Sequence, residues 1–183
     1  IRNVENYLAN VSKEIKADNF YFFGHELFLY VCTAMIKGER FKELHYLLNN
    51  DFVVTDHYYS RTNALSFSRF RRHLVSLDEH RNKRLKMNRK SITADLLKQR
   101  SGTPFSFDDL KETDALLYYL SIMKPGATAY MCWWPITSAY DTWNLNFMER
   151  GISIRFFNKV KALFGVNTIE EMREKVINSM PLD

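Results

Sequence analysis

The sequence is poor in the residues that build phosphate-binding loops and thiol-based frameworks. Its six glycines are isolated from one another, so there is no Gly-rich loop to hold the phosphates of a nucleotide. Its two cysteines, Cys32 and Cys132, lie far apart in apolar surroundings and form no CxxC pair. We therefore expect both to be buried free thiols, as is usual in a reducing cytoplasm.

Long hydrophobic runs are also missing. No stretch of about 18 apolar residues occurs, so no transmembrane helix is predicted. The first residues, IRNVENY, do not have the pattern of a signal peptide. These absences favour a cytoplasmic protein that does not engage a membrane. Because the chain begins with Ile rather than Met, we expect it to be part of a longer protein, with other domains or subunits beside it.

Patterns that bind metal or carry nucleophilic catalysis are absent as well. No Ser or Cys stands in a nucleophile elbow. His73 and His80 are two helical turns apart, but no carboxylate completes a ligand set at short spacing. His25 is followed by Glu26 yet lacks the second histidine of a zinc protease motif. We expect no metal and no other cofactor.

One hydrolytic class needs a closer test, because helical ribonucleases of the HEPN type use an Arg and a His with about four to six residues between them. Arg69 and His73 have only three residues between them, so the motif is not met. A ribonuclease with an irregular pair would draw on Arg72, His73, His80 and Arg81. The alternative makes His73 and His80 partners of Asp78 or Glu79 on a solvated helix face.

Positive charge is concentrated in one segment. The chain has 26 Lys and Arg against 21 Asp and Glu, a net charge of +5. Between Arg69 and Arg100 there are 11 basic and 3 acidic residues, a balance of +8, which leaves 15 basic and 18 acidic residues, a balance of −3, elsewhere. Local ion pairs cannot absorb an excess of this size, so the segment favours an anionic partner.

Arginine and lysine neutralise phosphates, and arginine can hold them with two parallel hydrogen bonds. The predicted phosphate contacts are Arg69, Arg72, Arg81, Arg84 and Arg89, and the predicted steering charges are Lys83, Lys86 and Lys90. The ligand would be nucleic acid or another anion, such as a nucleotide. Phe67 and Phe70 belong either to an aromatic core or to a base-stacking surface. A third reading is a basic face that docks on an acidic partner protein or domain.

Apolar residues at helical spacing predict helices over most of the chain. The segments are 2–17, 20–37, 39–50, 67–87, 92–100, 105–123, 152–164 and 169–180. Capping residues support several of these ends, namely Ser106, Thr168, Glu171 and Gly165. The segment 20–37 is apolar on all sides, which predicts a helix buried on most sides. The basic segment 67–87 could be one helix or an interrupted one, with Phe70, Leu74 and Leu77 facing the core.

Two short segments have strand character instead. Residues 52–55 are β-branched, residues 60–66 look like a polar loop, and residues 127–135 are β-branched and aromatic. We expect 127–135 to be extended, with 52–56 as its candidate partner. The predicted fold is therefore one mainly α-helical domain over 1–183, with about seven helices and, if these segments pair, one short two-stranded element (α+β).

Four phrases of the sequence carry a resemblance to a known family. They are ADLLKQR at 94–100, FDDLKETDALLYYL at 107–120, WWPITSAY at 133–140 and IRFFNKVKALFGV at 154–166. Together they resemble an uncharacterised helical domain that follows TIR- or sirtuin-like effector modules in bacterial antiphage and conflict proteins. The resemblance covers roughly residues 20–166. It implies a sensing, regulatory or assembly role beside an effector in the bacterial cytoplasm, hence a non-enzymatic domain that binds an anionic ligand or nucleic acid through 69–90.

Overall fold

The computed structural model describes residues 2–56, 61–128, 132–140 and 146–179. The fold is mainly α-helical with one two-stranded antiparallel sheet, which confirms the predicted class. In chain order the elements are α1 (Arg2–Lys37), α2 (Phe41–Asn49), β1 (Phe52–Asp56), β2 (Arg61–Leu65), η1 (Phe67–Phe70), η2 (Ser76–Arg81), α3 (Asn82–Leu85), α4 (Ile92–Arg100), α5 (Phe107–Ile122), η4 (Ile136–Tyr140), α6 (Asn146–Arg150), α7 (Ile154–Phe164) and α8 (Ile169–Ser179). Within these ranges, no helix has both the length and the apolar character that a membrane span requires.

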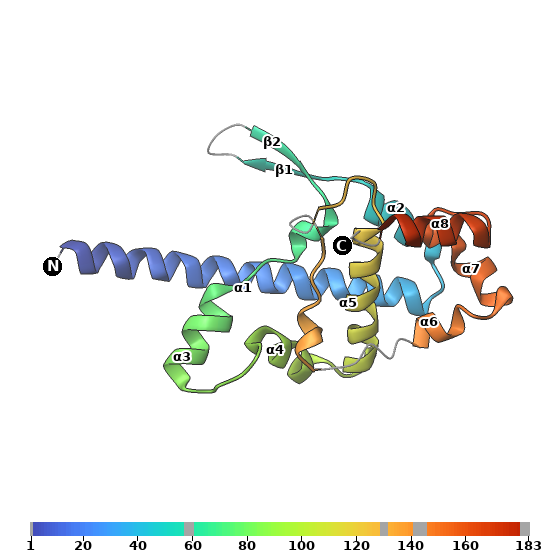
Figure 1. The fold of residues 1–183 in the computed structure, drawn as a ribbon. Coiled ribbons are helices and arrows are strands. Elements are labelled where there is room, and N and C mark those ends of the chain that lie inside the picture. The colour runs from blue at the N-terminus through green and yellow to red at the C-terminus, as the bar shows by residue number, and fades with distance from the viewer. Residues whose placement is uncertain (1, 57–60, 129–131, 141–145, 180–183) are drawn as a thin grey trace.

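The long helix α1 runs through the whole molecule (Figure 1). It joins the two helices predicted over 2–17 and 20–37, because the connecting residues contain neither proline nor glycine to break the helix. Its first part projects beyond all the other elements. Its second part packs against α2 and α5.

The second part of α1 is less covered than its composition predicts. Phe22, Leu29 and Cys32 point into the core and are buried. Phe20 and Leu27, on the opposite face, are 76% and 66% exposed. The prediction of a helix buried on most sides is therefore wrong for this chain alone, because the other helices cover only one face of α1.

An aromatic cluster forms the core between α1, the sheet and α5. Trp133 and Phe67 are fully buried, and their ring centroids lie 6.0 Å apart. Phe70 stacks on Phe28 with the centroids 4.6 Å apart, and it meets Phe52 edge to face at 4.9 Å. Phe67 is thus a core residue and Phe70 is partly buried against the core, with its ring packed on Phe28 and Phe52, so the two do not form a base-stacking surface.

Strand β1 has a different partner from the predicted one. β1 pairs with β2 in antiparallel register, with Phe52 opposite Leu65 and Asp56 opposite Arg61. The loop predicted over 60–66 is wrong, because 61–65 form β2. The predicted pairing of 52–56 with 127–135 is not seen in the described residues of that segment, which contain no strand, and its residues 129–131 lie outside the described ranges. Strands close in sequence lose little entropy when they pair, whereas Trp133 is taken up by the core.

The basic segment 67–87 is interrupted rather than one helix. It consists of the 3₁₀ turn η1, an extended stretch, the π-helical turn η2 and the short α3. The backbone N–H of Ser76 donates to the carboxylate of Asp18 on α1 at 2.8 Å, and Leu74 and Leu77 are buried as predicted. The extended stretch carries the chain from the side of α1 that bears the sheet to the side that bears α3 (Figure 1).

Several helix ends coincide with the predicted caps. The Ser106 hydroxyl accepts the backbone N–H of Asp109 at 3.2 Å, and the Asp109 carboxylate accepts the Ser106 N–H at 2.8 Å. Gly165 ends α7 with a φ of 64°, a conformation that favours glycine. The Thr168 hydroxyl accepts the backbone N–H of Glu171 at 3.1 Å where α8 begins. These ends depend on local chemistry, which explains why they could be predicted.

Candidate anion-binding surface

Most of the predicted cations gather on one short stretch, 81–90, which we call the basic turn. It comprises the end of η2, the one-turn helix α3 and part of the loop to α4. It lies on the side of α1 away from the sheet (Figure 1). Every residue from 83 to 90 is exposed. The predicted cations that it carries are Arg81, Lys83, Arg84, Lys86, Arg89 and Lys90.

The side chain of Asn82 holds the basic turn in shape. Its amide donates to the Arg89 carbonyl at 2.7 Å, and its amide oxygen accepts the Arg89 backbone N–H at 3.1 Å. The backbone N–H of Met87 donates to the Asn82 carbonyl at 3.1 Å, and that of Lys86 to the Lys83 carbonyl at 3.3 Å. This pair of bonds is a Schellman motif, with Lys86 in the left-handed conformation. The cations are therefore displayed on a defined backbone.

The three acids between Arg69 and Arg100 are all engaged. Asp78 accepts the backbone N–H of Thr93 at 2.9 Å at the start of α4. Glu79 lies 2.8 Å from His73. Asp95 pairs with Arg89 at 2.6 Å, and its other oxygen also contacts Arg89. Only the last of these neutralises an arginine, so most of the local excess of positive charge remains uncompensated.

Arg89 therefore differs from the other cations of the basic turn. Besides its two bonds to Asp95, it donates to the Tyr140 hydroxyl at 3.1 Å. The bonds from Arg89 lower the pKa of Asp95, against the opposing effect of its partial burial. In the described part of the chain, no acid lies within ion-pair distance of the remaining members, which are Arg81, Lys83, Arg84, Lys86 and Lys90. These five cations make up the candidate surface.

Replacing Lys86 by glycine should stabilise the protein. Lys86 has a φ of 50°, which costs a residue with a β-carbon about 1 kcal/mol and costs glycine almost nothing. In urea unfolding, we expect the Lys86→Gly variant to have a free energy of unfolding about 1 kcal/mol higher than that of the wild type. The matched control is Lys83→Gly, at a right-handed position in α3, which should lose about as much. Equal destabilisation by both changes would contradict the strained conformation.

The other two predicted contacts, Arg69 and Arg72, belong to a different part of the surface. Arg69 is on η1, which lies with the sheet on the other side of α1 from α3 (Figure 1). Arg72 is in the extended stretch, and its guanidinium lies 4.2 Å from the ring centre of Tyr21 on α1. A ligand on the basic turn would therefore have to cross α1 to reach Arg69.

The residues of the irregular ribonuclease do not assemble. His73 pairs with Glu79 at 2.8 Å, and both side chains are well exposed. Among the described residues, no hydrogen bond or ion pair links Arg72, His73, His80 and Arg81 to one another. The described residues also contain no group of three His, Cys, Asp or Glu that could hold a metal ion. The pairing of His73 with Glu79 matches the alternative in which His73 is the partner of a nearby acid on a solvated surface.

A shallow hollow of about 220 Å³ lies next to the basic turn. Its lining includes the cations of Arg89 and Lys90 and the carboxylate of Asp95. The Tyr140 hydroxyl donates to Asp95, and Lys98 lies 4.4 Å from the centre of the Tyr140 ring. Because a carboxylate belongs to the lining and pairs with Arg89, the hollow is poorly suited to hold an anion.

A buried polar cluster was not predicted from the sequence. Arg71 turns inward and donates to the Trp134 carbonyl at 2.7 Å. Burial lowers its pKa, and the charges of Asp114 and Asp78 oppose that shift. His25 lies beside it, stacked on Trp133 with the ring centroids 5.0 Å apart. Nothing in the charge pattern separates Arg71 from the exposed arginines around it, because its direction depends on the extended backbone.

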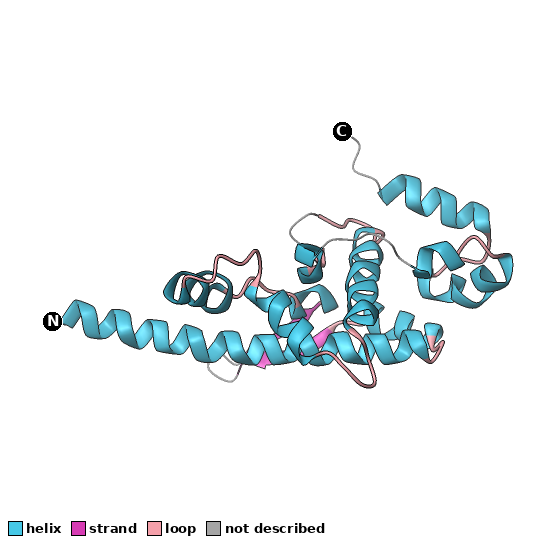
Figure 2. Cartoon of the chain, turned by 90° about the horizontal axis from the view of Figure 1, so that it is seen from below, coloured by secondary structure: helices cyan, strands magenta, loops and turns pink. Residues whose placement is uncertain are grey.

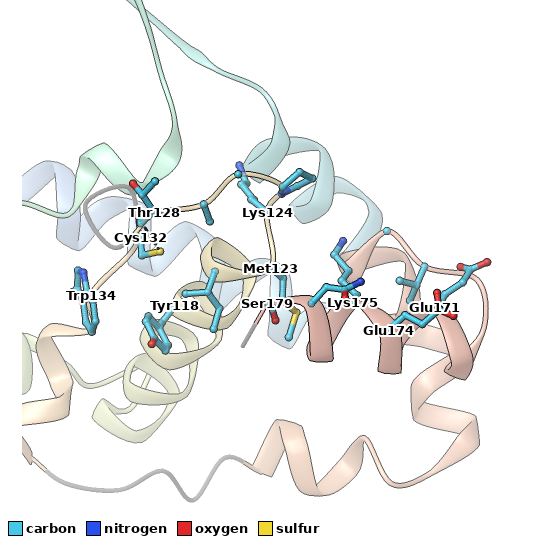
Figure 3. Close-up of a pocket in the computed structure, with 17 residues that line it drawn as sticks. Tyr118, Met123, Lys124, Thr128, Cys132, Trp134, Glu171, Glu174, Lys175 and Ser179 are labelled. Atoms are coloured by element: carbon cyan, nitrogen blue, oxygen red, sulfur yellow. Dashed lines mark hydrogen bonds between the residues drawn. The ribbon is translucent and has the colours of Figure 1, made fainter. Parts of the chain in front are cut away.

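A second hollow, of about 780 Å³, lies between the end of α5, the segment after it and α8 (Figure 3). Its two lysines donate to main-chain carbonyls, Lys124 to Leu48 at 2.5 Å and Lys175 to Phe164 at 2.6 Å. Trp134 stands at its edge and is half exposed. The hollow contains none of the predicted site residues. Its lysines hold segments of the chain together, which leaves them poorly placed to bind a ligand.

Comparisons of the chain with protein-family models, with curated protein sequences and with solved structures give no match.

Proposed function

We propose that this chain is a non-enzymatic accessory domain that binds nucleic acid through the basic turn. The observation that carries the proposal is the state of the charges. Five exposed or half-buried cations stand on a turn that Asn82 holds in shape, and the acids nearby are engaged elsewhere. A surface of this kind attracts a chain of phosphates, because each neutralised phosphate releases condensed counterions.

The same features predict how the nucleic acid would be held. Phe67 is in the core and Phe70 packs against it on Phe28 and Phe52, so neither ring is available to stack on bases. The lysines and arginines of the basic turn would contact phosphates, which carry no sequence information. We therefore propose binding to the backbone with little sequence preference and a strong dependence on salt.

Removing three cations of the basic turn should abolish most of the binding. We expect the Lys83→Ala, Arg84→Ala, Lys86→Ala triple variant to bind labelled single- and double-stranded DNA and RNA at least 10-fold more weakly. On duplex DNA, the slope of log affinity against log salt should become shallower by about 2–3, because three phosphate contacts are lost. Fluorescence anisotropy at about 50 and 200 mM salt measures both quantities.

The matched control removes three exposed cations from other helices, Lys42→Ala, Arg155→Ala and Arg173→Ala. It makes the same change in net charge and should weaken binding much less. Equal loss in the two triple variants would show that overall charge, and not the basic turn, is responsible. No binding of the wild-type protein to any of the four nucleic acids at low salt would contradict the proposal and favour an acidic protein partner.

The accessory role beside an effector is also a proposal, and it rests on the resemblance of 94–100, 107–120, 133–140 and 154–166. The reading frame that encodes the chain tests it. A TIR- or sirtuin-like module beside this domain would support a sensing role in a bacterial cytoplasmic defence protein. RNA cleavage that is lost in His73→Ala or His80→Ala would instead favour the ribonuclease.

A further inference from the structure

The exposed face of α1 carries a continuous row of apolar side chains, which we call the apolar stripe. It consists of Phe20, Phe23, Leu27, Val31 and Ala34. The first four are 76%, 53%, 66% and 38% exposed. At 100° per residue, the five lie within about 80° of arc, opposite the face that packs into the core. Figure 2 shows α1 along one edge of the molecule, with α5 and the C-terminal helices on one side of it.

A helix that is apolar on all sides is normally buried on all sides. In α1, the side chains of Phe22, Leu29 and Cys32 are buried, whereas those of the apolar stripe face solvent. Arg100 borders the stripe, because its guanidinium lies 5.4 Å from the centre of the Phe23 ring. An apolar centre with a polar rim is the usual composition of a protein–protein interface.

We propose that the apolar stripe is a dimer interface, where α1 packs antiparallel against α1 of a second copy about a two-fold axis at Leu27. The spacing supports this partner, because the stripe is symmetric about Leu27 in the sequence. A two-fold axis there places Leu27 against its own copy, Phe23 against Val31 and Phe20 against Ala34. Each bulky ring thus faces a smaller side chain, which is how facing helices interdigitate.

The helix dipoles favour the same antiparallel register. In an antiparallel pair the two helix dipoles point in opposite directions, whereas a parallel pair would place like ends of the two dipoles side by side.

The area is sufficient for a dimer of moderate affinity. At about 150–250 Å² for a whole aromatic side chain, Phe20 and Phe23 together expose about 200–300 Å². With Leu27 and Val31 added, two copies would bury on the order of 800–1,000 Å² from the stripe alone. Rim residues such as Arg72 and Arg100 bring the total near the lower limit of specific interfaces, about 1,200 Å². We therefore expect a dissociation constant in the micromolar range.

Sedimentation velocity at protein concentrations up to about 100 µM tests whether the dimer forms. The wild-type protein should shift from monomer to dimer as its concentration rises. Leu27→Asp should remain monomeric, because it places two like charges together on the symmetry axis. Ile177→Asp is the matched control, since it puts the same charge at an apolar position that is 67% exposed on α8, and it should still dimerise.

Cysteine cross-linking tests the register. In a Cys132→Ser background, Leu27→Cys should form a disulfide with its own copy on oxidation. Phe23→Cys should not cross-link to itself but should cross-link when mixed with Val31→Cys. A wild-type protein that is monomeric at about 100 µM would overturn the proposal. So would a dimer that survives Leu27→Asp, or Phe23→Cys chains that cross-link to each other as well as Leu27→Cys chains do. None of these measurements needs nucleic acid, so this test stands apart from that of the basic turn.

Discussion

Acidification should destabilise the wild-type protein much more than its His25→Phe variant. His25 is fully buried, and neither nitrogen of its ring has a hydrogen-bond partner among the described residues. Burial lowers its pKa from 6.5 to about 3, with a further contribution from the charge of Arg71 and an opposing one from the backbone of Phe70, which lies nearby but outside hydrogen-bond geometry. The folded protein therefore resists a proton that the unfolded chain accepts.

This difference in pKa determines the direction in which the stability of the fold changes with pH. Below about pH 6.5 the unfolded chain binds a proton at His25, whereas the folded protein does so only near pH 3. Stability must therefore fall as the pH drops between these two values, by up to about 1.4 kcal/mol for each pH unit. The variant lacks this group, so its stability should fall less over the same range. Carboxyl groups that are common to both proteins cancel in the comparison.

Urea unfolding followed by tryptophan fluorescence, at about pH 7.5 and about pH 4.5, measures the effect. Between these values the wild type should lose about 2–3 kcal/mol more than His25→Phe. At neutral pH the variant should be at least as stable, because a buried polar group without a partner costs about 1–3 kcal/mol. His80→Phe, at an exposed position, is the control and should behave like the wild type. If phenylalanine does not fit, His25→Leu serves the same purpose, and equal acid loss in wild type and variant would contradict the role of His25.

Replacing Asp114 by alanine should cost about 3–5 kcal/mol of stability. This carboxylate is fully buried and accepts three hydrogen bonds, from the Trp133 indole at 2.6 Å and from the Thr137 backbone N–H and hydroxyl at 2.9 and 2.8 Å. Alanine would leave these three donors without a partner and would remove a negative charge that faces Arg71. The bonds also attach the segment that begins at Trp133 to α5.

Urea unfolding at neutral pH checks this expectation, and the fluorescence of the folded state reports on Trp133. Asp108→Ala is the matched control, because Asp108 lies on the same helix with its side chain 84% exposed. Its loss should stay within about 0.5 kcal/mol. Asp114→Asn should also be costly, since its amide nitrogen would meet a donor. An Asp114→Ala protein within about 1 kcal/mol of wild type would show that the donors find other partners.

Local signals in the sequence determine much of this fold. The helix starts at Ser106 and Thr168 and the helix end at Gly165 were predicted, because each depends on bonds within a few residues. Helices α4, α5 and α7 were also predicted, because the helical spacing of their apolar residues is a local pattern. The excess of positive charge between 69 and 100 is a property of composition, and it holds whatever the fold.

Tertiary structure decides the rest, because the remaining contacts join residues far apart in the chain. The sequence suggested 127–135 as the partner of β1, but Trp133 is buried between α1 and α5, and β2 pairs with β1 instead. Arg71 and Arg81 look alike in the sequence, yet the first turns inward toward Asp114 and the second stays with the basic turn.

The same holds for α1. The apolar sequence of residues 20–37 predicts a helix buried on most sides, and only the packing of α5 and the core shows which face remains open. The sequence by itself therefore determined helices such as α4, α5 and α7 and the excess of positive charge between 69 and 100. Long-range packing decided the rest. It determines which cations have no acid within ion-pair distance, which histidine is buried without a hydrogen-bond partner and which face of α1 is exposed.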